Sequence, residues 1–172
     1  MSTEVIVREA KSSDSLPLIK FLDKVGAESH FLTMDDAGIL MGEEEMSEYL
    51  IQISEKDNNA YFLALVNGEI AGVLAVTADF HYRIRHIGDI FIAVANAFQG
   101  YGIASILFGD MIDWVVELGV IKRLELTVQK RNEKARHLYE KFEFECESVR
   151  KNGARDEHGN LIDVCEYVRF FE

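Results

Sequence analysis

The stretch FIAVANAFQGYGIASILF, from Phe91 to Phe108, joins the end of an apolar strand to a glycine-containing turn and the start of an amphipathic helix. The strand ends near Val94 or Ala95, and within ten residues the helix begins. Glycine and alanine in such a turn let backbone N–H groups approach a ligand closely, and the helix macrodipole adds positive potential there. The stretch therefore predicts an anion site suited to a pyrophosphate.

Two common phosphate-binding motifs do not fit this turn. No Gly-Lys-Ser/Thr follows it, as a P-loop would require. The G-x-G-x-x-G fingerprint of dinucleotide-binding folds is also absent, and the strand does not lie at the amino terminus. We therefore expect this turn to bind a phosphate-bearing ligand in another way than these two motifs do.

The segments on either side of this turn predict one α+β domain over residues 1–172, with a single mixed, mostly antiparallel sheet and helices on both faces. Asn67-Gly68 predicts a tight hairpin, and Gly119 ends a helix. We expect residues 26–40 and 152–160 to be loops. Strands are expected at 5–8, 61–66, 70–77, 86–94, 124–128, 144–150 and 161–171, and helices at 14–25 (Asp14 as N-cap), 42–53, 103–118 and 132–141.

Composition narrows the function classes. The chain has 18 Lys and Arg against 30 Asp and Glu, a net charge of −12, which disfavours nucleic-acid and anionic-membrane partners. This charge also attracts amines, although acidity of this kind often serves only solubility. The amino terminus is not a signal peptide and no apolar run nears 20 residues, so a cytoplasmic protein is expected. Cys146 and Cys165 match no metal-ligand spacing and lie in alternating apolar-polar stretches, so two buried, reduced thiols and no metal are expected.

Two short motifs carry a family resemblance. Residues 99–104 read Gln-Gly-Tyr-Gly-Ile-Ala, matching Q/R-x-x-G-x-G/A after a strand, and the asparagine-x-x-alanine then leucine-tyrosine signature stands as Asn132, Ala135, Leu138 and Tyr139. On these motifs and the element order, the chain resembles the GNAT superfamily of N-acetyltransferases, most of all its bacterial amino-group acetyltransferases. One departure is Glu143-Phe144, where the family usually has glycine-phenylalanine.

The resemblance implies a GNAT-like fold with a central pair of parallel strands that splay apart, acetyl-CoA as co-substrate, and direct acetyl transfer to a primary amine in a ternary complex. Val94 is the expected backbone contact of the thioester carbonyl. A basic segment, with seven Lys or Arg and three Glu between Lys122 and Lys141, would attract the phosphates. The implied cofactor-binding residues are Ile92, Ala93, Val94, Gln99, Gly100, Tyr101, Gly102, Ile103, Ala104, Ser105, Asn132, Ala135 and Tyr139.

Three residues are the candidates for catalysis. The resemblance makes Tyr139 the acid toward the departing coenzyme A sulfur, although its place on an apolar helix face also fits a packing role. The general base is left open between Asp89, in the strand before the turn, and Glu125, in the adjacent parallel strand. Asn132 either contacts coenzyme A or only caps its helix. Further base candidates are Glu28 and His30, in the loop after the first helix where the family builds its acceptor wall, and His81 and His86.

Two other function classes compete with the enzyme. One is a non-catalytic acyl-CoA-binding regulatory module, which Tyr139 and Asp89 argue against. The other is a nucleotide-binding protein, which the missing lysine argues against. The acceptor is left open between a small-molecule amine and a protein amine, and a homodimer is among the oligomeric states left open.

Overall fold

The computed structural model describes residues 3–172, which contain one seven-stranded sheet of order β1-β2-β3-β4-β5-β7-β6. Within these residues, every neighbouring pair of strands is antiparallel except β4 and β5. The strands are β1 (Val5–Glu9), β2 (Ala60–Val66), β3 (Glu69–Thr77), β4 (Ile87–Val94), β5 (Arg123–Gln129), β6 (Glu145–Arg155) and β7 (Leu161–Phe170). The helices are α1 (Ser15–Glu28), α2 (Glu43–Ser54), α3 (Ile103–Leu118) and α4 (Glu133–Lys141).

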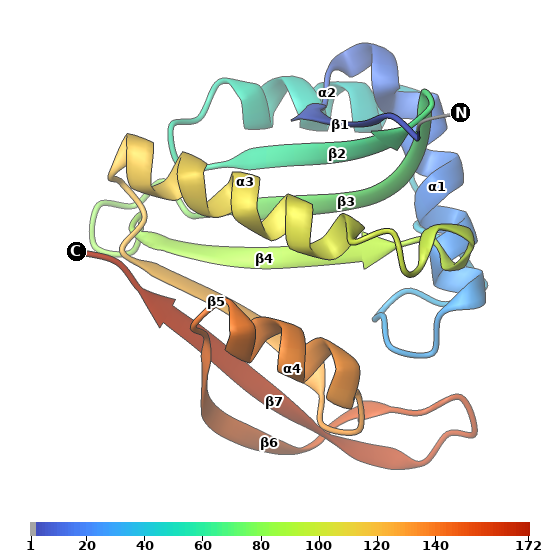
Figure 1. Cartoon of the computed structure of the whole chain (residues 1–172), viewed down its shortest axis with the longest axis vertical. Helices are drawn as coiled ribbons and strands as arrows, with labels where there is room; N and C mark the ends of the chain where they lie inside the picture. Colours follow the sequence, from blue (N-terminus) through green and yellow to red (C-terminus); the bar gives the residue numbers. More distant parts are fainter. Residues whose placement is uncertain (1–2) are drawn as a thin grey trace.

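Helices cover both faces of the sheet, as the sequence predicts (Figure 1). Helices α1 and α2 pack on one face, where Leu18, Leu22 and Leu50 belong to a core with the inward side chains of β2, β3 and β4. Helices α3 and α4 pack on the other face around Phe108 and Met111. None of the helices in residues 3–172 has the length and apolarity needed to cross a membrane.

The central parallel pair splays apart, which confirms the fold class. Strands β4 and β5 pair only through residues 87–89 and 123–125. Beyond Asp89 and Glu125, β4 stays with β3 as far as Val94, and β5 stays with β7 as far as Gln129. The two strands therefore diverge toward their carboxyl ends (Figure 1), and residues of both strands line an opening between them.

Left-handed residues occur in the turns that the sequence predicts and at other positions as well. Asn67 and Gly68 have φ of 49° and 85°, which confirms the β2–β3 hairpin, and Gly119 ends α3 at φ 67°. Glu143 also adopts a left-handed conformation, at φ 66°. The turn after α4 is thus kept although glutamate replaces the usual glycine, at the steric cost that a Cβ brings there.

The first helix begins after Asp14, as the sequence predicts, but the role of the Asp14 side chain and the end of the helix differ from the prediction. Asp14 makes no side-chain cap for α1, because its carboxylate accepts two hydrogen bonds from the guanidinium of Arg8, at 2.7 and 2.8 Å. The helix also continues past Val25 to Glu28, so Glu28 is helical rather than part of the loop. The loop between α1 and α2 therefore spans residues 29–42.

The loop predicted at 152–160 is wrong in its first half, because β6 runs on to Arg155. Asn152 is left-handed at φ 53°, and the register against β7 shifts between Arg150 and Ala154, so these residues form a bulge rather than a turn. A Cβ on Gly153 would lie 2.9 Å from the Cβ of Val164, which explains the glycine. The turn itself is confined to residues 156–160.

Candidate active site

The opening between β4 and β5 is part of a continuous cleft of about 1430 Å³. One part of its lining comes from the α3/α4 face, including Gly102 and Tyr139, and another from the α1/α2 face, including Tyr49 and Asp89. We call these the α3/α4 half and the α1/α2 half of the cleft. A molecule that threads the opening would reach both faces of the sheet.

The glycine turn forms the end wall of the α3/α4 half. Gly100 and Gly102 have φ of 85° and 74°, which L-residues rarely adopt, and a Cβ on either would meet nothing within 4 Å. The open space beside them is therefore available to a ligand. No carbonyl within residues 3–172 accepts from the N–H groups of Ile103, Ala104 and Ser105, the first residues of α3. These donors and the helix dipole lie where the sequence predicts an anion site.

Strand β4 directs backbone N–H groups into the opening. The N–H of Ala95 donates to Ala71 on the β3 side, at 2.9 Å, and successive residues of a strand alternate in direction. The N–H groups of Ile92 and Val94 therefore point toward β5, where pairing has ended. Ala93 lies between them, with its side chain in the core against α1 and α2.

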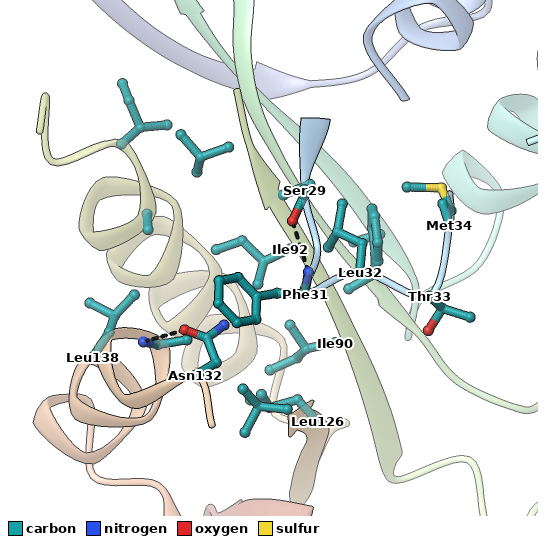
Figure 2. A pocket seen from close by; sticks show the side chains of 18 of the residues that line it. Ser29, Phe31, Leu32, Thr33, Met34, Ile90, Ile92, Leu126, Asn132 and Leu138 are labelled. Atoms are coloured by element: carbon teal, nitrogen blue, oxygen red, sulfur yellow. Dashed lines mark hydrogen bonds between the residues drawn. The ribbon is translucent and has the colours of Figure 1, made fainter. Parts of the chain in front are cut away.

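Helix α4 faces the glycine turn across the cleft. Its N-cap, Asn132, accepts a hydrogen bond from the N–H of Ala135 at 3.3 Å, so it caps the helix and lines the cleft at once (Figure 2). Lys134 Nζ reaches Gln99 Oε1 at 3.4 Å and links α4 to the turn.

Tyr139 is 6% exposed, yet it lines the cleft, and no hydrogen-bond partner for its hydroxyl lies within residues 3–172. Burial raises the pKa of Tyr139 to about 12, so the phenol is protonated at neutral pH. Both the packing role and the acid role considered for this residue fit its position.

Asp89 and Glu125 lie directly opposite each other at the last pair of the parallel ladder, with side chains on the α1/α2 face. Asp89 lines the cleft and has no ion-pair or hydrogen-bond partner among residues 3–172. Loss of water and the neighbouring Glu125 raise its pKa. Glu125 does not line the cleft, and its carboxylate accepts from Arg123 Nε at 2.9 Å. The geometry thus favours Asp89 over Glu125 as a group that can take a proton.

Of the remaining base candidates, Glu28 and the exposed His30 line the cleft, whereas the other two lie outside it. Glu28 lines the cleft, but its Oε1 accepts from the N–H of Asn96 at 2.8 Å and fixes the segment before the glycine turn. His81 pairs with Asp79, and neither His81 nor His86 lines the cleft. The exposed side chain of Tyr101 also lies outside it and packs edge-on against Phe98.

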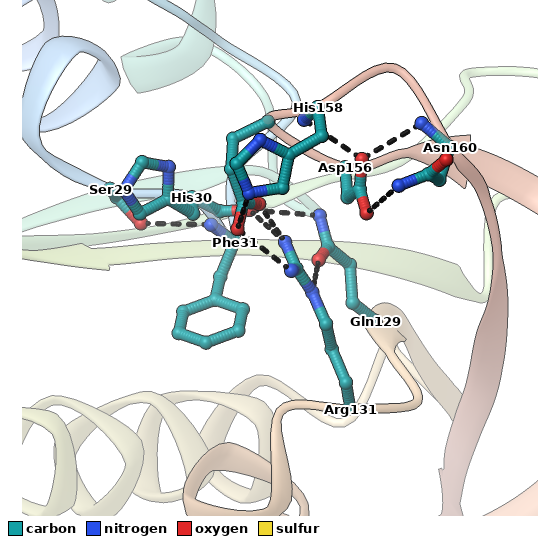
Figure 3. Close-up of polar contacts among 9 residues, drawn as sticks. Ser29, His30, Phe31, Gln129, Arg131, Asp156, His158 and Asn160 are labelled. Carbon is teal, nitrogen blue, oxygen red and sulfur yellow. Dashed lines mark hydrogen bonds and ion pairs between the residues drawn. The ribbon is translucent and has the colours of Figure 1, made fainter.

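The structure contains a set of side-chain contacts between distant segments that the sequence does not predict. The Arg131 guanidinium donates to the carbonyl of His30 at 3.0 Å, to Gln129 Oε1 at 2.8 Å and to Glu157 Oε2 at 2.8 Å (Figure 3). Gln129 Nε2 donates to the same His30 carbonyl at 3.2 Å. The Arg131 clamp, meaning Arg131 with these three partners, ties the α1–α2 loop to the β6–β7 turn. A lone arginine after a strand carries no sequence signal for this role.

Phe31 follows the clamped carbonyl and enters the cleft. Its ring lies 5.3 Å from the guanidinium carbon of Arg131. Figure 2 shows the ring pointing between Ile92 of β4 and Asn132 at the start of α4. The α1–α2 loop therefore contributes a side chain at the centre of the cleft.

Within residues 3–172, no group of three or more His, Cys, Asp or Glu side chains is arranged to hold a metal ion. Cys165 is buried, but Cys146 is exposed, so the expectation of two buried thiols is wrong for Cys146.

Comparisons with known proteins agree on one family. Residues 30–144 match the model of the Acetyltransferase (GNAT) family. An acetyltransferase of the GNAT family from Streptococcus pneumoniae is 40% identical and superposes with a TM-score of 0.95 over 98% of this chain and 100% of that one. The L-amino acid N-acetyltransferase AaaT of Escherichia coli (strain K12) is 28% identical over 69% of this chain and 72% of its own length. The ribosomal alpha-N-protein acetyltransferase RimL, in complex with coenzyme A, shares the fold at a TM-score of 0.80, with 22% identity over 99% of this chain and 96% of that one.

Proposed function

The chain belongs to the GNAT family of acetyltransferases, and on this premise we propose that it moves an acetyl group from acetyl-CoA to a primary amine by direct attack in a ternary complex. The single observation that carries the proposal is the cleft that passes through the splayed strands. It offers anion-binding N–H groups on one face of the sheet and a free carboxylate on the other. Donor and acceptor can thus meet in the opening without sharing an entrance.

The residues of the α3/α4 half fit acetyl-CoA. The N–H groups of Ile103, Ala104 and Ser105 suit the pyrophosphate, and the absence of a Cβ at Gly100 and Gly102 leaves it room. The N–H groups of Ile92 and Val94 suit a pantetheine amide and the thioester carbonyl. Further contacts come from Gln99, Asn132, Ala135 and Tyr139, all of which line the cleft.

The chemistry divides between the two halves. Acetyl-CoA supplies the activated acetyl group as a thioester. Asp89 accepts a proton from the incoming ammonium through a chain of water molecules, because a free amine is needed for attack and Asp89 lies five residues before Val94 in β4. The N–H of Val94 donates to the carbonyl oxygen and stabilises negative charge there. Tyr139 holds a proton at its hydroxyl oxygen for the departing sulfur.

The acceptor class is an amine of a small molecule or of a protein. AaaT is named for L-amino acids and RimL for a ribosomal protein. These names span both kinds of acceptor.

The test is a direct assay of thiol release. The protein is given acetyl-CoA with a panel of primary amines, and free coenzyme A and the N-acetyl product are both measured. Acetylated product is the expected result. Binding of acetyl-CoA without turnover of any amine would favour a regulatory module, and binding of ATP in preference to coenzyme A would favour a nucleotide-binding protein.

A further inference from the structure

The lining of the α1/α2 half of the cleft includes three methionines and several aromatic side chains. Helix α2 and the loop before it contribute Met41, Met46 and Tyr49, and the sheet beneath contributes Tyr61 and Phe91. Met34 of the α1–α2 loop completes this lining. Methionine side chains are flexible and polarisable, and they adapt to apolar bodies of varied shape.

The polar groups on this half are two phenols and two carboxylates, those of Glu28 and Asp89, together with small hydroxyl side chains. Burial raises the pKa of Tyr49 and of Tyr61, so both phenols are neutral at physiological pH. Glu28 is engaged with the Asn96 N–H. Asp89 lies two residues before Phe91 on the same face of β4. Its carboxylate has no partner among residues 3–172. An ammonium group would find its counter-charge there.

This half also offers no uncommitted cation near Asp89 among the described residues. Arg131 is held by Glu157, Gln129 and the His30 carbonyl. The lysines of the cleft lining, Lys134 and Lys141, belong to α4, in the α3/α4 half. The His30 side chain is exposed at the rim. A carboxylate carried next to the reacting amine would therefore lose water without gaining a partner, which is costly.

We propose that the acceptor is a primary amine on an apolar, preferably aromatic, body with no carboxylate on the carbon that bears the amine. The inference rests on the proposed acetyl transfer. Asp89 supplies the counter-charge for the ammonium through water, and the apolar body lies among Met34, Met41, Met46, Tyr49, Tyr61 and Phe91. In the reaction, the amine nitrogen forms the C–N bond as the C–S bond breaks. The ammonium and acetyl-CoA yield the N-acetyl amide, free coenzyme A thiol and one proton released to water.

The experiment compares four acceptors at saturating acetyl-CoA. They are 2-phenylethylamine, ethylamine, L-phenylalanine and L-phenylalaninamide, with kcat/KM expressed per free amine and the products identified by mass spectrometry. The amide arm separates a peptide-like source of the amine from a simple arylalkylamine. 2-Phenylethylamine is at least as basic as phenylalanine, so a greater free-amine fraction cannot explain a faster reaction.

We expect kcat/KM for 2-phenylethylamine to exceed that for ethylamine by about 100-fold or more, because the ring is buried. We expect it to exceed that for phenylalanine by about tenfold or more, because the carboxylate is unpaired. Phenylalanine or ethylamine matching 2-phenylethylamine would overturn this inference and leave the proposed function intact. Turnover of none of the four, nor of any amine in the wider panel, would overturn both.

A pair of variants tests the same point by adding a charge. Met41→Lys places a cation in the lining and should raise the ratio of phenylalanine to 2-phenylethylamine turnover by about three- to tenfold. Leu40→Lys is the matched control, because Leu40 is 88% exposed and does not line the cleft. Its ratio should stay at the wild-type value. An equal shift in both variants would overturn the placement of the acceptor. Should Met41→Lys fail to fold, the wild-type ratios decide alone.

Discussion

Replacing Tyr139 by phenylalanine removes one hydroxyl from a ring that is packed in the core and also lines the cleft. The ring centre lies 5.5 Å from that of Phe108 and 6.0 Å from that of Tyr167. Phenylalanine keeps these contacts, and the lost hydroxyl has no partner within residues 3–172. The free energy of unfolding should therefore change by less than about 1 kcal/mol, because no intramolecular hydrogen bond is broken.

The expected effect on the reaction is much larger. Loss of a general acid lowers kcat by about 10²–10⁴, which corresponds to about 2.7–5.4 kcal/mol in the barrier. Because burial raises the pKa of Tyr139 to about 12, the phenol stays protonated through neutral and mildly alkaline pH, and the loss should be the same at pH 7 as at pH 9. The KM for acetyl-CoA should stay near the wild-type value. Initial rates of thiol release and calorimetric melting measure both effects.

Tyr167→Phe is the matched control on the neighbouring ring. Its hydroxyl accepts from Arg136 Nε at 3.1 Å and donates to Glu140 Oε1 at 3.0 Å. Losing these bonds should cost about 1–2 kcal/mol, or about 2–8 °C in Tm, with kcat within about twofold of wild type. A Tyr139→Phe protein that melts lower but turns over normally would refute the acid role and leave a packing residue.

Asp89→Asn should lower kcat/KM at neutral pH, with partial recovery at high pH, where the amine is already deprotonated. The control Glu125→Gln should show no pH-dependent loss. The opposite pattern would assign the general base to Glu125. Since the pKa of Asp89 is raised above 3.8, its contribution to stability is present below that pH and lost as the pH rises through the raised pKa, so Asp89→Asn should melt at an equal or higher Tm at pH 7. Gly102→Val should lower Tm and raise the KM for acetyl-CoA at least about tenfold. Gly119→Val, at the other left-handed cap of α3, should lower Tm by a similar amount and leave the KM unchanged. Equal KM values for the two variants would show that the glycine turn is not part of the site. Arg131→Gln should release the α1–α2 loop, seen as faster amide hydrogen exchange, and lower kcat/KM for the amine while the Kd of acetyl-CoA stays constant; unchanged exchange would show that the clamp does not hold the loop. Because Arg131 lowers the pKa of Glu157 to about 2, wild-type protection of the loop should persist on acidification until the pH nears that value.

Short-range sequence patterns predict most elements but not what their residues do in context. Asn67-Gly68 and Asn152-Gly153 are the same dipeptide, yet the first makes a hairpin turn and the second a bulge inside β6. Cross-strand pairing with β7 decides the second case, and no local signal carries that information. Asp14 is a similar case, because the tertiary ion pair with Arg8 takes the carboxylate away from the helix end.

The candidate site divides in the same way. The glycine turn and the start of α4 could be predicted because their residues are contiguous and their backbone chemistry is local. The α1/α2 half could not, because Met34, Met46 and Phe91 come from separate elements and each fits an ordinary core. The Arg131 clamp joins positions about a hundred residues apart, which no window of sequence spans.

The three residue pairs between β4 and β5 divide the sheet into two half-sheets that are joined by one short ladder. Four strands lie on one side of that ladder and three on the other, and beyond its pairs the two sides are joined by side-chain packing and by side-chain hydrogen bonds such as those of the Arg131 clamp. A substrate bound in the gap, as proposed, would contact both half-sheets. Part of its binding energy would therefore stabilise the association of the two half-sheets. Ligand at 100 times its Kd would add about 2.7 kcal/mol to the free energy of unfolding. Under the proposed function, the two half-sheets would therefore be held together most firmly while substrate is bound and less firmly once the product leaves.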